Sequence, residues 1–89
     1  MEFDWHPPKR AKTLAERGID FVDVLVGFAD PQRKVAEDAR KDYHEVRYNM
    51  LAKCHGRVFH ITFTQRGPVN WIISARKANT REQKRYEQG

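Results

Sequence analysis

The residues with the most evident chemistry in this chain alternate along two stretches that are typical of neighbouring strands. Glu45 and Arg47 lie on the polar side of one stretch and His60 on the polar side of the next, and one-sided burial would leave both sides facing water. A proton acceptor beside cations suits the cleavage of RNA without a metal. A base must deprotonate the 2′-hydroxyl, an acid must protonate the leaving 5′-oxygen, and cations must balance the phosphate charge. The candidate bases and acids are Glu45, His60 and Tyr86, and the candidate phosphate ligands are Arg47, Arg66, Arg76 and Lys77.

Two simpler interpretations stand beside this one. Charge pairs across a solvated sheet explain any single one of these positions equally well, and spacing alone does not assign the pairings. Trp5 and Trp71 have the ring area to stack on bases, but aromatic residues at strand positions are more often packing residues.

The charge of the chain favours an anionic partner. Its 17 Lys and Arg against 12 Asp and Glu give a formal net charge of +5 and a pI of about 9.7. A basic domain attracts nucleic acid through counterion release, and the same field attracts acidic proteins. The cations gather in 9–17 and in the last sixteen residues, whereas 18–38 holds five acids against two bases.

Several other classes of protein fit poorly. Cys54 is the only cysteine, so no internal disulfide forms, and the four histidines lack zinc-ligand spacing. No glycine-rich phosphate loop or nucleophile elbow is present. The first residues lack the pattern of a signal peptide, and no apolar run has the length of a membrane span. We expect one cytoplasmic domain over residues 1–89, without a cofactor or a metal.

The elements that must position the polar residues follow from changes in hydrophobic period. Apolar residues recur at helical spacing over 8–17 and again from Asp20 to about residue 30, and Gly18 ends the first of these helices. A short strand over 3–5 precedes them. Asn79, three positions before Glu82, is a capping residue that predicts a last helix from Thr80.

Alternation with a period of two predicts the strands. It runs over 46–52, 59–64 and 69–74, with turns at 54–57 and 66–68 between them. In the last strand, Ile73 shares one side with Val69 and Trp71, and Ile72 and Ser74 share the other. The order predicts an α+β fold in which a short strand, two helices and a last helix accompany an antiparallel sheet, with part of one sheet face left open.

Taken together, several segments of the chain resemble the BrnT family of bacterial type II toxins. The resemblance covers nearly the whole chain in the right order, and its most specific part is the run IISARKA with Glu82 and Tyr86 behind it. The other matching segments are Phe3 to Pro7, Arg17 to Phe21, Glu45 to Tyr48 and Thr64 to Gly67.

This resemblance implies a RelE-like fold and a ribonuclease that cuts RNA and inhibits translation. It also implies a BrnA-type antitoxin that neutralises the toxin, commonly in a heterotetramer whose antitoxin binds operator DNA. Carried over by position, the implied active residues are Glu45, Arg47, Arg66, Ser74, Arg76, Lys77 and Tyr86.

The chain departs from the family pattern at three places. Glu16-Arg17-Gly18 stands where the family has Lys-His-Gly, Pro68 replaces an acidic residue, and Trp71 replaces an arginine. The alternative to an active nuclease is therefore a weakened or non-catalytic basic module that binds RNA or an acidic protein. Both uses, cleavage and partner binding, can share one surface.

Overall fold

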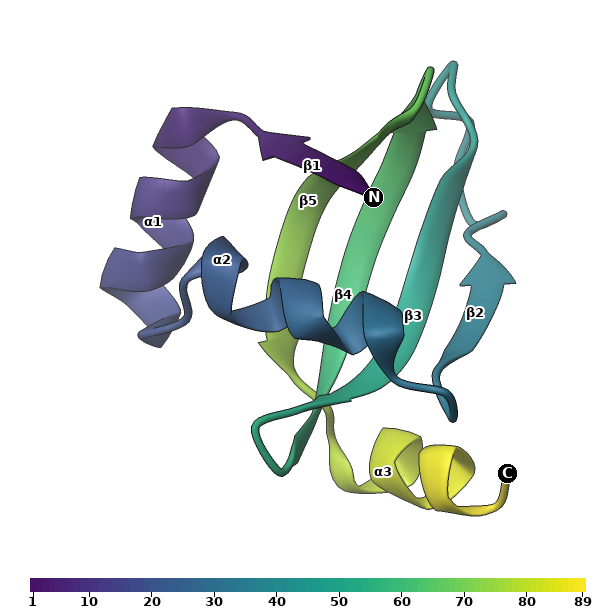
Figure 1. Cartoon of the computed structure of the whole chain (residues 1–89). Coiled ribbons are helices and arrows are strands. Elements are labelled where there is room, and N and C mark those ends of the chain that lie inside the picture. Colours follow the sequence, from purple (N-terminus) through teal and green to yellow (C-terminus); the bar gives the residue numbers. More distant parts are fainter.

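The computed structural model describes all 89 residues and consists of a five-stranded mixed sheet with three α-helices and one 3₁₀ helix (Figure 1). The α+β class predicted from the sequence is confirmed. No helix has the length and apolar character needed to cross a membrane. In chain order the elements are β1 (Glu2–Trp5), α1 (Pro7–Arg17), α2 (Phe21–Val24), the 3₁₀ helix η1 (Leu25–Ala29), β2 (Lys34–Glu37), β3 (Arg47–Cys54), β4 (Arg57–Arg66), β5 (Val69–Lys77) and α3 (Thr80–Glu87).

The sheet has the order β1-β5-β4-β3-β2. The three long strands form antiparallel hairpins, as predicted, but the expectation of a wholly antiparallel sheet is wrong at one edge. There, β1 returns beside the last strand and pairs with it in parallel. β2, a strand that the period of the sequence did not predict, forms the other edge, where little burial is available to impose alternation.

Local sequence explains the ends of these elements. α1 begins with Pro7, at a position where a backbone N–H would have no partner within the helix. It ends at Gly18, which has a left-handed backbone conformation with φ 68°. Asp20 caps α2 by accepting a hydrogen bond from the amide of Val22. His55 and Gly56 both have positive φ, 52° and 82°, as the tight turn between β3 and β4 requires.

The main core lies on the side of the sheet that faces α2 and η1, which we call the inner face. The helical stripe of Phe21, Val24 and Phe28 is buried there against the sheet, as the sequence predicted, although the second half of that helix is wound as 3₁₀. Gly27 lies so close to β3 that an added Cβ would be 2.9 Å from the Cβ of Ala52. The sheet contributes Met50, Ala52, Cys54, Ile61, Phe63, Ile72 and Ala75 to this core.

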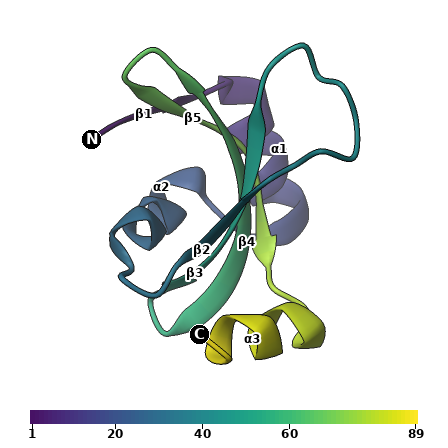
Figure 2. The same cartoon turned by 90° about the vertical axis from the view of Figure 1, so that its right-hand side faces the viewer.

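The opposite side of the sheet, the outer face, is less open than predicted. In Figure 2 the segment over 38–46 and α3 project on the side away from α2 and flank this face at its two ends. Thr62 and Thr64, which lie on the same side of β4 as His60, are only 8% and 1% exposed. A small second core of Leu51, Val58, Ala78 and Tyr86 attaches α3 to the same face.

A β-bulge in β5 decides which of its last residues reach the outer face. Thr62 pairs with Ser74 while Phe63 pairs with Ile72, so Ile73 is an extra residue. The predicted uninterrupted alternation over 69–74 is therefore wrong, because the bulge moves Ser74 to the side of Trp71. Beyond it, Ala75 is buried in the core, Arg76 lies on the outer face and Lys77 lies on the inner face.

Candidate functional site

The outer face carries a carboxylate held between two arginines at the end of the sheet where β3 begins and β4 ends. Oε2 of Glu45 lies 3.3 Å from Nε of Arg47, and Oε1 lies 3.5 Å from Nη2 of Arg66. We call these three residues the Glu45 cluster. Its side chains are reachable from water, with Glu45 26% and Arg66 50% exposed. One carboxylate against two guanidinium groups leaves an excess positive charge that suits a phosphate.

Two aromatic rings hold the arginines of the cluster in place. The Arg47 guanidinium lies 4.0 Å from the ring centroid of Tyr43, and that of Arg66 lies 4.3 Å from the ring centroid of Trp71. Trp71 thus orients an arginine from the neighbouring strand. The two-residue turn between Arg66 and Val69 places Trp71 diagonally across from Arg66. A hairpin with this turn, read from the sequence, would therefore have indicated the contact.

The segment over 38–46 is fixed to the sheet by a row of hydrogen bonds. Asp38 accepts two bonds from the guanidinium of Arg40, at 2.9 and 2.8 Å, and its amide donates to the carbonyl of Arg47. The Arg40 guanidinium holds the pKa of Asp38 well below its usual range. At the other end of the segment, the Thr64 hydroxyl donates to the carbonyl of Val46 at 2.6 Å. These bonds position Glu45, and no sequence motif had indicated Asp38 or Tyr43.

A second charged group lies farther along the same face. Arg76 donates two hydrogen bonds to the carboxylate of Glu82, at 2.8 and 2.9 Å, and that carboxylate also accepts the amide of Asn79. The Arg76 guanidinium lowers the pKa of Glu82 to about 2. Because Glu82 completes the capping box of α3, this pair joins β5 to α3 and carries no excess charge.

His60 is paired across the sheet with Arg76. Burial, helped by the positive charge of Arg76, lowers the pKa of His60, so the ring is mostly neutral at pH 7. Four residues of β4 separate it from Thr64, which is opposite Arg47, and at about 3.3 Å per residue this is roughly 13 Å. His60 and the Glu45 cluster therefore do not reach the same phosphate.

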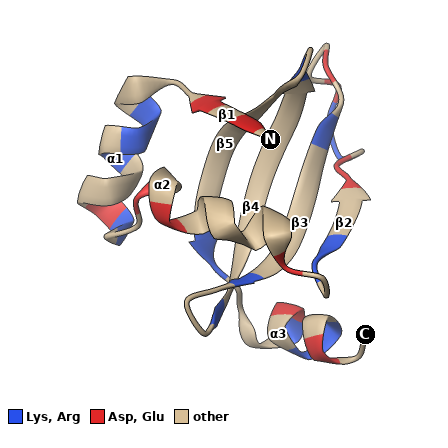
Figure 3. Ribbon diagram, in the orientation of Figure 1, with Lys and Arg blue, Asp and Glu red and all other residues tan.

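The structure thus brings together only part of the predicted set. Glu45, Arg47 and Arg66 form the cluster, and Ser74 and Arg76 lie farther along the outer face. Lys77 faces the opposite side of the sheet. Figure 3 shows the cations in separate groups, at the start of β3, at the end of β5 and along α1.

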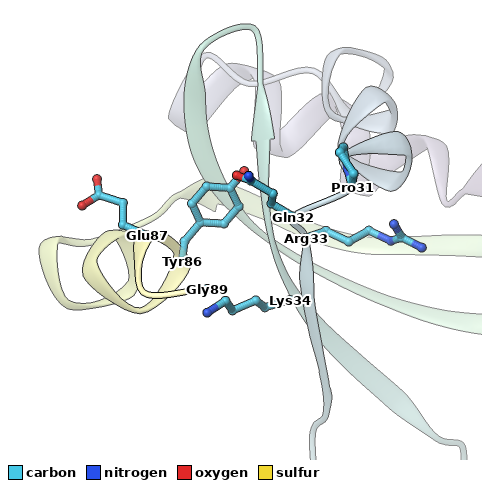
Figure 4. A pocket seen from close by; sticks show the side chains of 7 residues that line it. All are labelled: Pro31, Gln32, Arg33, Lys34, Tyr86, Glu87 and Gly89. Atoms are coloured by element: carbon cyan, nitrogen blue, oxygen red, sulfur yellow. The ribbon is translucent and has the colours of Figure 1, made fainter.

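Tyr86 is not part of the Glu45 cluster, because its side chain attaches α3 to the segment that follows η1. The side chain points from α3 toward the segment that carries Pro31 and Gln32, at the mouth of a shallow pocket (Figure 4). It is 5% exposed, and its hydroxyl donates to Oδ2 of Asp30 at 2.6 Å. This hydrogen bond, together with burial, raises the pKa of Tyr86 to about 12.

Replacing Tyr86 with phenylalanine should lower the free energy of unfolding by about 1–3 kcal/mol, since a hydrogen bond to a charged group is lost. Denaturant unfolding followed by circular dichroism measures the change. Tyr48→Phe makes the same chemical change at a half-buried ring without a hydrogen-bonded hydroxyl, and should have little effect. Equal stability of the two variants would show that the Asp30 contact does not anchor α3.

No three His, Cys, Asp or Glu side chains lie close enough together to hold a metal ion. The model of the family described as the ribonuclease toxin BrnT of type II toxin-antitoxin systems matches residues 5–82. The search of curated proteins returned no match. The matched range contains the whole Glu45 cluster, the β-bulge and the Arg76–Glu82 pair.

Proposed function

Since the chain belongs to the BrnT family of ribonuclease toxins of type II toxin-antitoxin systems, we propose that it cleaves RNA at the Glu45 cluster by chemistry that needs no metal. The observation that carries the proposal is a water-accessible carboxylate flanked by two arginines, 3.3 and 3.5 Å away. These are a proton acceptor and two phosphate ligands within reach of one phosphodiester.

In the proposed reaction, Glu45 takes the proton of the 2′-hydroxyl while the 2′-oxygen attacks the adjacent phosphorus. Arg47 and Arg66 balance the charge that builds on the phosphoryl oxygens. The bond from phosphorus to the 5′-oxygen then breaks, and the leaving oxygen takes a proton from water, which reaches this exposed face. The products are a 2′,3′-cyclic phosphate and a free 5′-hydroxyl.

The loose contacts within the cluster support this assignment over one at Arg76. The pairs of Glu45 are 3.3 and 3.5 Å long, whereas Arg76 is held by Glu82 in a two-pronged contact of 2.8 and 2.9 Å. A phosphate can thus enter between Glu45 and its arginines at less cost than it can displace Glu82.

We further propose a RelE-like arrangement, a BrnA-type antitoxin in a heterotetramer, and inhibition of translation as the cellular result. Two helices before the long strands and one after them support the first of these. The net charge of +5 supports both an RNA substrate and a partner that is acidic where it docks.

The test is incubation of the purified protein with RNA in the presence of a chelator, followed by mass spectrometry of the products. Fragments that end in a 2′,3′-cyclic phosphate are expected. Cleavage that stops with chelator, or that leaves a 5′-phosphate, would contradict the proposed chemistry. RNA binding with a steep salt dependence and no cleavage would favour the alternative, a non-catalytic binding module.

A further inference from the structure

A second cationic site lies on the inner face, at the end of β5, away from the Glu45 cluster. It is an open pocket of about 700 Å³, and we call it the Lys77 pocket. This volume is within the usual range for sites that hold a small organic group. Three cations from three separate elements line it, together with apolar side chains and one acid: Arg17, Arg57, Lys77, Ile19, Phe59 and Asp23.

The cations of this pocket differ from four arginines on and beside the outer face in having no carboxylate partner. Arg40, Arg47, Arg66 and Arg76 each lie within 4.0 Å of an acidic oxygen. Arg17, Arg57 and Lys77 make no such pair, although Asp23 lines the same pocket. Their charge is therefore free to act on a bound anion.

Backbone contacts hold two of these cations at the end of β5. The guanidinium of Arg17 donates to the carbonyl of Ala75 at 2.9 Å. That of Arg57 donates to the carbonyls of Val58 and Ala78, at 2.6 and 3.1 Å. Each contact uses only part of the five N–H donors of an arginine, so the remaining donors are available to a ligand.

Part of the pocket lining is apolar. Ile19 is 8% exposed and belongs to the main core, and the Phe59 ring packs against that core while remaining half-buried. Cations beside aromatic and aliphatic side chains form the combination that binds a phosphate and the base attached to it. An acidic peptide would need only the cations.

We propose that the Lys77 pocket binds a nucleotide of the RNA substrate that lies several positions from the bond cut at the Glu45 cluster. The inference rests on the proposed function. Arg76 and Lys77 are consecutive but lie on opposite faces, so an RNA strand that follows the outer face reaches the pocket by passing round the end of β5. On β4, Thr64 lies opposite Arg47 of the Glu45 cluster, and Phe59 lies opposite Lys77. These two positions are five residues apart, or roughly 17 Å along the strand, which a dinucleotide is too short to span.

The test compares Lys77→Glu with Lys12→Glu, a matched charge reversal at an exposed position on α1. The probe is a ten-nucleotide RNA with 2′-O-methyl groups, which binds but is not cleaved, and affinity is measured by fluorescence anisotropy at several salt concentrations. Lys77→Glu should weaken binding about tenfold and flatten the salt dependence by about one unit of slope, while Lys12→Glu has little effect.

Two outcomes would overturn the inference. The first is equal RNA affinity of the two charge-reversal variants. The second is unchanged RNA affinity in Lys77→Glu with weakened binding of an oligoglutamate peptide, which would assign the pocket to an acidic protein. Because the probe cannot be cleaved, a failure of the unaltered protein to cut RNA would refute the proposed function and leave this binding test intact.

Discussion

Replacement of Glu45 by glutamine is expected to lower the rate of RNA cleavage by roughly 10²–10⁴-fold, the usual contribution of a positioned general base. Glutamine keeps the size of the side chain, but its amide does not accept the proton of the 2′-hydroxyl. The same change removes the negative charge between Arg47 and Arg66, so binding of a non-cleavable RNA should become tighter. A lost rate together with a gained affinity separates a catalytic role from damage to the binding surface.

The rate is measured at saturating RNA, and affinity with a 2′-O-methyl oligonucleotide. Glu37→Gln is the matched control, because Glu37 is an exposed carboxylate on the edge strand with no ion-pair partner. The contradicting result would be a Glu45→Gln protein that cleaves normally while His60→Asn does not. In that case His60, neutral at pH 7 because of burial and Arg76, would be the base, and the rate would fall as the pH drops through its lowered pKa.

Much of the fold could be predicted from the sequence because its signals are local. Pro7, Gly18 and Asp20 mark helix ends by backbone preferences that hold in any context. The hairpin at His55-Gly56 needs positive φ at both central residues, and an Asn79-to-Glu82 spacing forms a capping box wherever it starts a helix.

The arrangement of the candidate site was harder to predict from the sequence, because a single extra residue in β5 changes it. Alternation predicts that Ser74 lies on the side of Ile72, whereas the bulge at Ile73 moves Ser74 and Arg76 to the outer face and Lys77 to the inner face. The pairing of β4 with β5 determines this bulge, and no short stretch of sequence contains that information.

Long-range contacts also decide the role of Tyr86. In the sequence it is an aromatic residue near the end of a basic helix, and the resemblance to the BrnT family implied a place in the active set. In the structure its hydroxyl is bound to Asp30, 56 residues earlier in the chain. Similarly, Arg76 appears in sequence as a free phosphate ligand, but the turn into α3 brings Glu82 against it.

Arg76→Ala is expected to destabilise the fold, because it leaves the carboxylate of Glu82 poorly solvated and without its main partner. The Glu82 side chain is only 12% exposed, and loss of a partner for such a group costs about 1–3 kcal/mol, toward the lower end here because Arg76 itself is 39% exposed. Denaturant unfolding measures the loss. Lys84→Ala, a cation on the exposed side of α3, should change stability by less than about 0.5 kcal/mol.

The double variant Arg76→Ala/Glu82→Gln and a pH series separate the ion pair from simple truncation of Arg76. Removing the stranded charge with glutamine should restore part of the stability lost in Arg76→Ala. The pKa of Glu82 in the folded state, about 2, is below its ordinary value of 4.5. The pair therefore stabilises the unaltered protein fully above about pH 4.5, and this stability disappears as the pH falls toward 2. Arg76→Ala should lose less stability over that interval. If instead it unfolds like the unaltered protein at every pH but cleaves RNA far more slowly, Arg76 acts on the phosphate and the catalytic surface extends along β5.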